Sequence, residues 1–322
     1  MRCNMFAPPK LRGKYLDKVL SSGWYTVGDM NERLLRALGE FWGVPRKHLL
    51  LTSSATAACM AVMQEKVAPC GCRCDEVYVT KATFPGIHHV CPQVEHDPSR
   101  LNSMEAAIIT DIGGARPIDE GVELFSNQQS LYAKRRIWLR DICHSWILDT
   151  RFDFCFASFY PTKLVPGAEG GVLYCRDPED RARLRWMINC GIVPGTGVDG
   201  GVEWGYPLHM GDVQAALNLE ALENSPAYMQ NCWELWQSLA KLAKDRNLPY
   251  REQPLRPYLF QLEVNDVPEF RKQMRACGYP TQCNFPPAPL VTLPMDLWMS
   301  VIERTKMMDT AKEIVNALSS SA

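Results

Sequence analysis

The sequence predicts an α/β protein in which a large domain with a mostly parallel sheet precedes a smaller α+β domain. Two observations carry this prediction. Short apolar segments of strand length recur between residues 49 and 175, and helical or loop stretches separate several of them. That alternation is typical of a parallel sheet whose crossover connections are helices. The chain is also long enough, at 322 residues of which 46% are hydrophobic, to bury one large core and a second smaller one.

Six segments have the composition of buried strands, because each is short and rich in aliphatic, aromatic or β-branched side chains. Asp141 directly follows the fourth of them and Ser158 ends the fifth. Open α/β sheets bind their ligands at such strand ends. The six segments are Leu49–Thr52, residues 77–80, Ala106–Thr110, residues 136–140, residues 152–158 and Gly171–Cys175.

Helices are expected between and after these strands. From Asn31 apolar residues recur at helical spacing, and Gly43 is the expected stop. The run Ser53-Ser-Ala-Thr56 follows the first strand and is expected to cap a helix that reaches Met63. Later helices are expected at residues 181–188, 211–222 and 229–244, and the Gly-rich residues 191–205 form a candidate active-site cover.

The last part of the chain has the pattern of a smaller α+β domain. A strand is expected at residues 258–264, a helix at residues 267–277 and a terminal helix at residues 307–318. We therefore expect three regions. They are an N-terminal segment with a substrate loop (residues 1–30), a large cofactor-binding domain (residues 31–225) and a small C-terminal domain (residues 226–322).

The charge balance argues against two classes of partner. Lys plus Arg number 35 and Asp plus Glu 36, whereas proteins that bind nucleic-acid polymers or membrane surfaces usually carry a basic excess. No stretch approaches the roughly 20 apolar residues of a membrane span, and the first residues contain no apolar run of signal-peptide length. The expectation is a cytoplasmic protein whose 13 cysteines stay reduced.

One cysteine cluster invites comparison with a metal site. Cys70 to Cys74 are spaced C-x-C-x-C, with His88, His89 and Cys91 further on. Closed zinc sites more often use C-x₂-C pairs, and no second pair follows at the spacing of a ribbon or finger. We expect a turn rich in small residues here and no metal.

Three polar groups meet the demands of pyridoxal 5′-phosphate (PLP), which needs a lysine for a Schiff base, a carboxylate for its ring nitrogen and donors for its phosphate. Lys163 follows the Ser158 strand end, Asp141 ends a buried strand, and the Ser53 to Thr56 turn precedes a helix. Each has an ordinary alternative. A Ser/Thr cap needs no ligand, a strand-end Asp can cap the next segment, and a loop lysine can simply be solvated.

The segment around Lys163 resembles the lysine segment of the DegT/DnrJ/EryC1/StrS aminotransferase family. Its sequence is Ser158-Phe-Tyr-Pro-Thr-Lys163-Leu-Val-Pro-Gly-Ala-Glu-Gly-Gly171, with serine, lysine and E-G-G in register. Further blocks are similar to the family in the same order, so the resemblance spans about residues 20 to 295. These blocks are Gly23-Trp-Tyr-Thr-Val-Gly28, Ser53-Ser-Ala-Thr-Ala-Ala58, Asp75 to Phe84, Asp141-Ile-Cys-His144, Met210 to Ala216 and Leu293-Pro294.

The resemblance implies a fold-type I PLP enzyme and a role for each matching residue. Lys163 would be the Schiff-base lysine and proton shuttle, and Asp141 would pair with the pyridine nitrogen. Ala55, Thr56 and Ser158 would hold the phosphate. His144 would lie near O3′ or the ring edge and Phe84 would stack on the ring, although a buried structural role remains open for each of these two.

The sequence departs from the family pattern on the substrate side. Pro207 stands where the family has the Asn that reaches the partner subunit's phosphate, and proline has no N–H or side-chain donor to replace it. His209 replaces Arg, Cys190 replaces His, and Asn284 replaces the His of the family's H-Y-P. These changes favour an acceptor other than a common 3-keto or 4-keto nucleotide sugar. The alternative is that neighbouring residues replace the lost contacts and the substrate class is unchanged.

The implied activity is transfer of an amino group from an amino-acid donor to a ketone or aldehyde acceptor, sugar-like or nucleotide-linked. Another PLP reaction (decarboxylation, elimination or dehydration) and a non-catalytic PLP-binding protein are the alternatives. The retained Lys163 favours transamination over dehydration, since family members with His at this position lean to dehydration. The resemblance also implies a homodimer with shared active sites.

Overall fold

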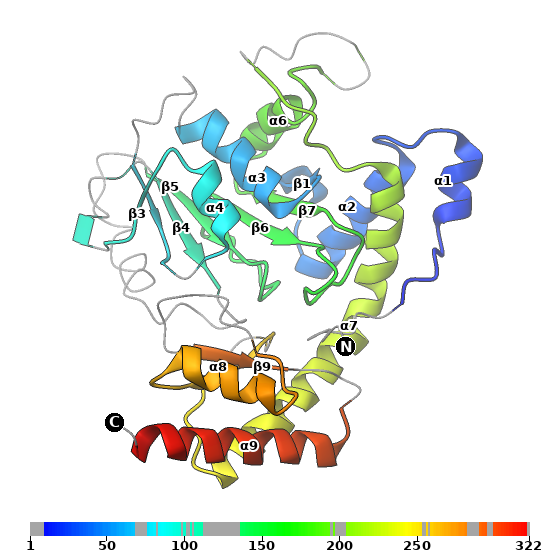
Figure 1. The fold of residues 1–322 in the computed structure, drawn as a ribbon. Helices are drawn as coiled ribbons and strands as arrows, with labels where there is room; N and C mark the ends of the chain where they lie inside the picture. Colours follow the sequence, from blue (N-terminus) through cyan, green and yellow to red (C-terminus); the bar gives the residue numbers. More distant parts are fainter. Residues whose placement is uncertain are drawn as a thin grey trace.

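The computed structural model describes residues 10–67, 76–81, 83–97, 99–100, 104, 106–111, 136–193, 196, 204–252, 256, 258–281, 290–294 and 299–320. Within these ranges the chain forms a larger body around a seven-stranded sheet and a smaller body around a two-stranded sheet (Figure 1). The Cys70 to Cys74 cluster, Asn284 and most of residues 194–203 lie outside the described residues.

The large sheet is mostly parallel, which confirms the predicted fold class. From β3 to β6 every neighbouring pair is parallel, and only β7 runs antiparallel to both of its neighbours. All six predicted strands form, and the short β3 at the edge was not predicted. In spatial order the strands are β1 (Leu49–Thr52), β7 (Gly171–Cys175), β6 (Phe154–Ser158), β5 (Ile137–Asp141), β4 (Ala106–Thr110), β2 (Glu76–Val79) and β3 (Gln93–Glu95).

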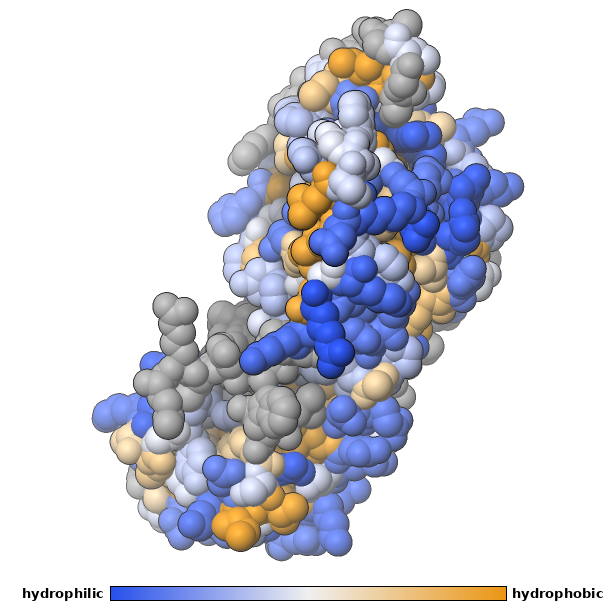
Figure 2. Space-filling view, turned by 90° about the vertical axis from the view of Figure 1, so that its right-hand side faces the viewer, coloured by the Kyte–Doolittle hydropathy of each residue, from blue (hydrophilic) through white to orange (hydrophobic). Residues whose placement is uncertain are grey.

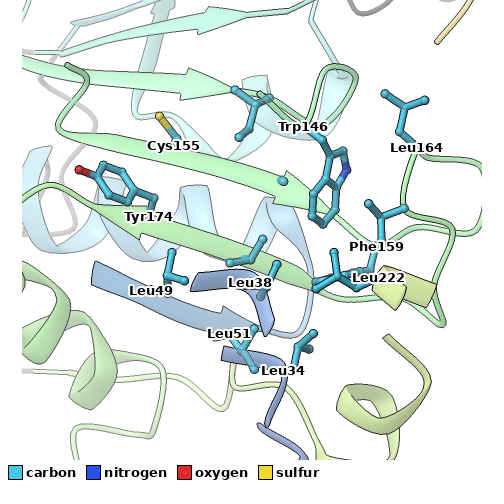
Figure 3. Close-up of a cluster of buried hydrophobic side chains, with 14 of the residues drawn as sticks. Leu34, Leu38, Leu49, Leu51, Trp146, Cys155, Phe159, Leu164, Tyr174 and Leu222 are labelled. Atoms are coloured by element: carbon cyan, nitrogen blue, oxygen red, sulfur yellow. The ribbon is translucent and has the colours of Figure 1, made fainter. Parts of the chain in front are cut away.

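Helices cover both faces of this sheet because successive strand residues point to opposite sides. Leu49 and Leu51 pack in the cluster with α1 (Leu16–Ser22), α2 (Asp29–Trp42) and the start of α7 (Asp212–Asp245), part of which Figure 3 shows. Leu50 packs on the opposite face. The helices there are α3 (Ala55–Val62), α4 (Pro85–Val90) and α6 (Pro178–Met187), with the short turns η1 (Arg46–His48) and η2 (Met63–Val67) beside them.

Helix α7 runs unbroken through the point where two separate helices were predicted, so that prediction was wrong. Proline lacks the N–H that would bond the carbonyl four residues earlier, and this normally ends or kinks a helix. Here the hydroxyl of Ser225 donates to that same carbonyl, of Leu222, at 2.8 Å. The helix therefore continues past Pro226 and passes from the larger body to the smaller one (Figure 1).

The smaller body has its own core. The antiparallel pair β8 (Phe260–Glu263) and β9 (Leu290–Leu293) packs with the second half of α7, α8 (Val267–Ala276) and α9 (Val301–Ser320). The predicted strand and helices form, although α9 begins before the predicted start and β9 was not predicted. The boundary placed after residue 225 falls inside α7, and the domain limits remain a prediction.

One face of the surface shows the two bodies of the molecule. Figure 2 looks onto the side that carries α1 and shows a largely hydrophilic surface, with scattered apolar patches over two connected bodies. In the part of the chain that the structure describes, we find no helix with the length and apolarity needed to cross a membrane.

Candidate active site

The ends of several strands meet at one edge of the large sheet. Strands β5 and β6 are parallel, so Asp141 and Ser158, which end them, lie at the same edge. Gly171 begins β7 and pairs with Ser158 on one side and with Thr52 of β1 on the other. The turn from Thr52 into α3 is therefore next to Ser158. The predicted carboxylate and the predicted phosphate residues share one edge.

The N-terminus of α3 has the features of an anion site. Ser54 caps the helix by accepting a hydrogen bond from the amide of Ala57 at 3.0 Å. The amides of Ala55 and Thr56 find no acceptor within the described residues, and such amides suit a phosphate. A Cβ atom on Gly171 would lie 2.4–2.5 Å from backbone atoms of Ser54 and Ala55. Glycine is therefore required for β7 to pack against this turn.

Asp141 is a buried carboxylate, with 4% of its surface exposed. Burial raises its pKa. The amide of Cys143 donates to its Oδ1 at 2.9 Å, and this bond and the positive charge of Lys163 oppose the rise. A buried carboxylate is costly without a cationic partner, so Asp141 is suited to a protonated ring nitrogen.

His144 is buried beside this carboxylate. Burial, together with the positive charge of Lys163, lowers its pKa well below the usual value, so its imidazole is neutral at physiological pH. Its ring centroid lies 4.5 Å from that of Tyr258, at an interplanar angle of 38°. The burial of His144 agrees with both roles that the sequence left open.

Lys163 lies in the loop between β6 and β7, and the ends of this loop are closed by backbone hydrogen bonds. The amide of Phe159 donates to Gly170 at 2.9 Å, and the amide of Gly167 donates back to Phe159 at 3.0 Å. Phe159 and Leu164 are buried in the core beneath the loop, as Figure 3 shows. The loop is therefore anchored on both sides of the lysine.

Asn218 is a residue that the sequence analysis missed. It is fully buried on α7, its Oδ1 accepts from the amide of Ala168 at 2.9 Å, and its Nδ2 donates to the carbonyl of Glu169 at 2.8 Å. A Cβ on Gly167 would lie 2.2 Å from its Oδ1. Asn218 thus clamps the E-G-G part of the lysine loop. The sequence signal that could have identified Asn218 is a polar amide side chain within the apolar stripe of α7.

A second buried network supports the segment that carries His144. Asp111 accepts from Arg140 at 2.9 and 3.0 Å and from the hydroxyl of Ser145 at 2.5 Å. Arg140 also pairs with Asp149 at 2.9 Å. Burial raises the pKa of Asp111 to about 6, and Arg140 opposes this rise. Because Ser145 follows His144 directly, the network holds that turn at the sheet edge.

Phe84 is not a core residue, since 58% of its surface is exposed. It precedes α4, and the hydroxyl of its neighbour Thr83 lies 2.8 Å from the hydroxyl of Thr110 at the end of β4. A Cβ on Gly86 would lie 2.6 Å from the Phe84 ring and 3.5 Å from Oγ1 of Thr56. The structure therefore places Phe84 at the same edge as the other predicted cofactor residues, and simple core packing does not explain it.

Pro207 and His209, two of the residues that depart from the family pattern, lie on a segment that contacts the end of β1. Pro207 pairs with Asn189, and His209 pairs with Thr52 in isolated bridges. The Nδ1 atom of His209 is buried and has no hydrogen-bond partner among the described residues. Cys190 is exposed and adopts a positive φ of 57°. This segment thus reaches the sheet edge without a cationic side chain at positions 207 and 209.

The predicted substrate loop is anchored at its backbone and open at its side chains. Asp212 accepts at 2.9–3.2 Å from amides at the start of α2 and from the side chain of Asn31. Its own amide donates to the carbonyls of Tyr25 and Thr26 at 3.0 and 2.6 Å. Trp24 and Tyr25 are nevertheless 61% and 51% exposed. Large apolar surface is thus displayed on a fixed backbone.

A mostly parallel sheet with a lysine loop and a carboxylate at its strand ends is the arrangement expected of a fold-type I PLP enzyme. The chain matches the DegT/DnrJ/EryC1/StrS aminotransferase family over residues 10–108 and 150–318. It therefore belongs to this family. Membership confirms the predicted family, the predicted class of PLP-dependent aminotransferase and the predicted cofactor.

Individual relatives are similar over most of their length. The lipopolysaccharide biosynthesis protein RfbH of Salmonella typhimurium is 25% identical, covering 90% of this chain and 72% of that protein. The sugar aminotransferase CalS13 of Micromonospora echinospora aligns with a TM-score of 0.78 at 18% identity, covering 97% of each chain. NtdA of Bacillus subtilis, solved with bound cofactor PMP, aligns with a TM-score of 0.77 at 16% identity, covering 94% and 81%. At these identities the two structures show the shared fold.

Proposed function

We propose that this aminotransferase moves an amino group from an amino-acid donor to the ketone or aldehyde carbon of a sugar-like or nucleotide-linked acceptor. One observation carries the proposal. A lysine loop, a buried carboxylate and a helix N-terminus lie at one edge of a single sheet. The names of RfbH and of the sugar aminotransferase CalS13 support a sugar-like acceptor.

The residues at this edge fit PLP. The amides of Ala55 and Thr56, with the hydroxyl of Ser158, would hold the phosphate. Asp141 would pair with the ring nitrogen, and its burial is the chemical reason, since a desolvated carboxylate favours a cation. The exposed ring of Phe84 would cover one face of the cofactor.

Bound PLP and three residues of the chain would then perform the chemistry. Bound PLP supplies an electron sink for the amino-acid carbon. Asp141 keeps a proton on the ring nitrogen by its charge. Lys163 would anchor the cofactor covalently and, with its amine free, would move a proton at its Nζ. His144, neutral because it is buried, can exchange a hydrogen bond near the ring without adding charge.

The acceptor pocket is proposed to differ from that of relatives that use common keto nucleotide sugars. Pro207 offers no donor and His209 offers no permanent charge, so a phosphate group would lose two contacts at this segment. Sites built around hydrogen bonds discriminate strongly against a substrate that leaves those groups unpaired. A smaller or differently substituted carbonyl compound is the proposed acceptor.

The proposed assembly is a homodimer with active sites shared between subunits, located in the cytoplasm. The exposed Trp24 and Tyr25 support the homodimer, because aromatic side chains of this kind are enriched in protein interfaces. Light scattering combined with activity measurements tests this assembly, and a stable monomer with full activity would contradict it. Cell fractionation tests the location.

An absorbance spectrum of purified protein, recorded with and without a panel of amino acids, tests the donor half-reaction. We expect the band of the covalently held cofactor to collapse with one donor class and to return on addition of a carbonyl acceptor. Release of carbon dioxide, or loss of water from the substrate, would instead identify a decarboxylase or a dehydratase.

A panel of keto sugars and non-sugar carbonyl compounds tests the acceptor. We expect little turnover of ordinary 3-keto and 4-keto nucleotide sugars. Efficient turnover of a 4-keto nucleotide sugar, saturating at the micromolar to low millimolar levels usual for enzymes, would show that the departures at Pro207 and His209 are neutral.

A further inference from the structure

Tyr258 lies where the chain passes from the larger body into the smaller one. Tyr258 and Leu259 pack in the core of the larger body, whereas Phe260 and Leu262 pack in the core of the smaller one. The preceding Arg256 also reaches back, with its guanidinium 5.7 Å from the ring centroid of Phe41 on α2. The segment before β8 is thus held against the larger body.

The side chain of Tyr258 contacts three parts of the candidate active site. Its ring centroid lies 5.3 Å from Nζ of Lys163 and 4.5 Å from the ring centroid of His144. Its hydroxyl lies 3.4 Å from Oγ1 of Thr162, the residue before the lysine. Tyr258 is itself buried. It comes from the segment before β8, which the proposed function does not otherwise use.

These contacts matter when the amine of Lys163 is free, that is, when it has no covalent bond to a cofactor. A protonated amine needs a partner in a site that is shielded from water, and the face of an aromatic ring provides one. The neutral His144 cannot provide a compensating charge, and the carboxylate of Asp141 would be paired with the cofactor ring. The ring face of Tyr258 is therefore the available support for the free amine.

We propose that Tyr258 is a positioning residue that holds the free amine of Lys163 in its reactive place and couples it to the smaller body. The inference rests on the proposed function, since it assigns a role toward the same lysine. The ring carries this role more than the hydroxyl does. The distance to Thr162 is at the long end for a hydrogen bond, whereas the ring faces both Lys163 and His144.

Three variants test the proposal through attachment of the cofactor rather than through activity. Tyr258→Phe keeps the ring, Tyr258→Leu removes it, and Tyr250→Leu is the control. Tyr250 stacks on Phe260 in the smaller body, with ring centroids 5.6 Å apart, so its loss weakens that body without touching the lysine loop.

Apoprotein is mixed with PLP, samples are reduced with borohydride at timed intervals, and the adduct on the Lys163 peptide is quantified by mass spectrometry. We expect Tyr258→Leu to slow adduct formation by about 10-fold or more, while Tyr258→Phe and Tyr250→Leu stay within about 3-fold of wild type. Circular dichroism confirms that each variant is folded. If Tyr258→Leu does not fold, Tyr258→Met is used, since it fills the space without a ring face.

Two results would overturn the proposal. One is wild-type attachment in the Leu or Met variant, and the other is an equal defect in Tyr250→Leu, which would assign the effect to packing of the smaller body. Failure of the proposed function is distinguishable, because it would appear as absence of amino transfer by the wild-type protein and would leave the difference in attachment between the Tyr258 variants unchanged.

Discussion

The strand-end edge and the substrate loop differ in how the molecule holds their side chains. At the strand-end edge polar groups are buried and bound by the chain itself, as Asp141 is by an amide and Asn218 is by two backbone groups. In the substrate loop the backbone is bound by Asp212, but the side chains of Trp24 and Tyr25 are exposed. The polar groups of the first region are held by contacts within the chain, whereas the second region leaves two aromatic side chains exposed.

The strand-end edge holds the residues proposed for catalysis, whereas the substrate loop holds residues proposed for recognition of another molecule. A buried polar group is tolerated only with a partner, so every change at the strand-end edge has consequences for the cofactor or for stability. An exposed side chain on an anchored backbone can change with little effect on folding. We therefore expect substitutions in the two regions to differ in kind as well as in size.

The largest effect is expected for Lys163→Ala. Covalent attachment of the cofactor should be abolished and turnover lost, because no other group can form the bond at that place. The free energy of unfolding should change by only about 0.5 kcal/mol or slightly more, since the side chain extends from a loop. Borohydride reduction with peptide mass spectrometry checks the site, and Lys241→Ala, an exposed lysine on α7, is the control. An adduct on any lysine other than Lys163 would end the assignment.

Asp141→Asn should keep the cofactor bound but reduce kcat by on the order of 100-fold or more, since an amide cannot hold the ring proton by charge. Steady-state kinetics of the loaded variant checks this. Asp245→Asn, an exposed carboxylate at the end of α7, is the control. Near-normal turnover would remove Asp141 from its role.

The same variant should change the pH dependence of the apoprotein. Burial raises the pKa of Asp141, so the carboxyl contributes stability at low pH that is lost as the pH rises through its folded-state pKa. Asn does not titrate. The apoprotein of the variant should therefore be more stable than wild type at pH 8, and this gain should vanish near pH 4. Urea denaturation at both values measures it, and an equal difference at the two pH values would contradict it.

Asn218→Ala should affect both stability and cofactor attachment. It leaves the amide of Ala168 and the carbonyl of Glu169 without partners, which should cost about 2–3 kcal/mol of the free energy of unfolding. Because these groups belong to the lysine loop, attachment at Lys163 should also slow. Urea denaturation and timed borohydride trapping check the two effects. Asn316→Ala on the exposed face of α9 is the control, and a stability loss without slower attachment would reduce Asn218 to a packing role.

The residues that the sequence could predict are those whose signal is local. The lysine motif from Ser158 to Gly171 is one continuous stretch, and Asp141 directly follows a buried apolar run, so spacing alone places both at strand ends. The strands themselves follow from short apolar runs between turn signals. The large sheet and the placement of Asp141 and Ser158 at strand ends could therefore be predicted.

The residues that were missed reach the site through tertiary contacts. Asn218 meets the lysine loop across 50 residues of sequence, and Tyr258 meets Thr162 across 96. The amide of Asn218 is unusual within the apolar stripe of α7, but nothing near either residue in the sequence identifies the partner that it contacts. The prediction of two separate helices around Pro226 was wrong for the opposite reason. Proline is a strong local signal for the end of a helix, but the hydroxyl of Ser225 donates to the carbonyl that the proline cannot bond.

The smallest effect on folding and chemistry is expected for Trp24→Ala. Within the described residues the indole donates to the nearby carbonyl of Val27, at 2.9 Å, and to no other group. The free energy of unfolding should therefore change by about 0.5 kcal/mol, and attachment at Lys163 should not change. If the loop completes a shared site, the Trp24→Ala dimer should dissociate at a protein concentration about 10-fold higher than the wild-type dimer, or KM should rise. The reason is that buried aromatic residues contribute most of the binding energy of an interface. Light scattering over a dilution series and steady-state kinetics measure both. Val301→Ala, which is similarly exposed at the start of α9, should change neither. Loss of attachment in Trp24→Ala would show that the substrate loop belongs with the strand-end edge, and the comparison between the two regions would fail.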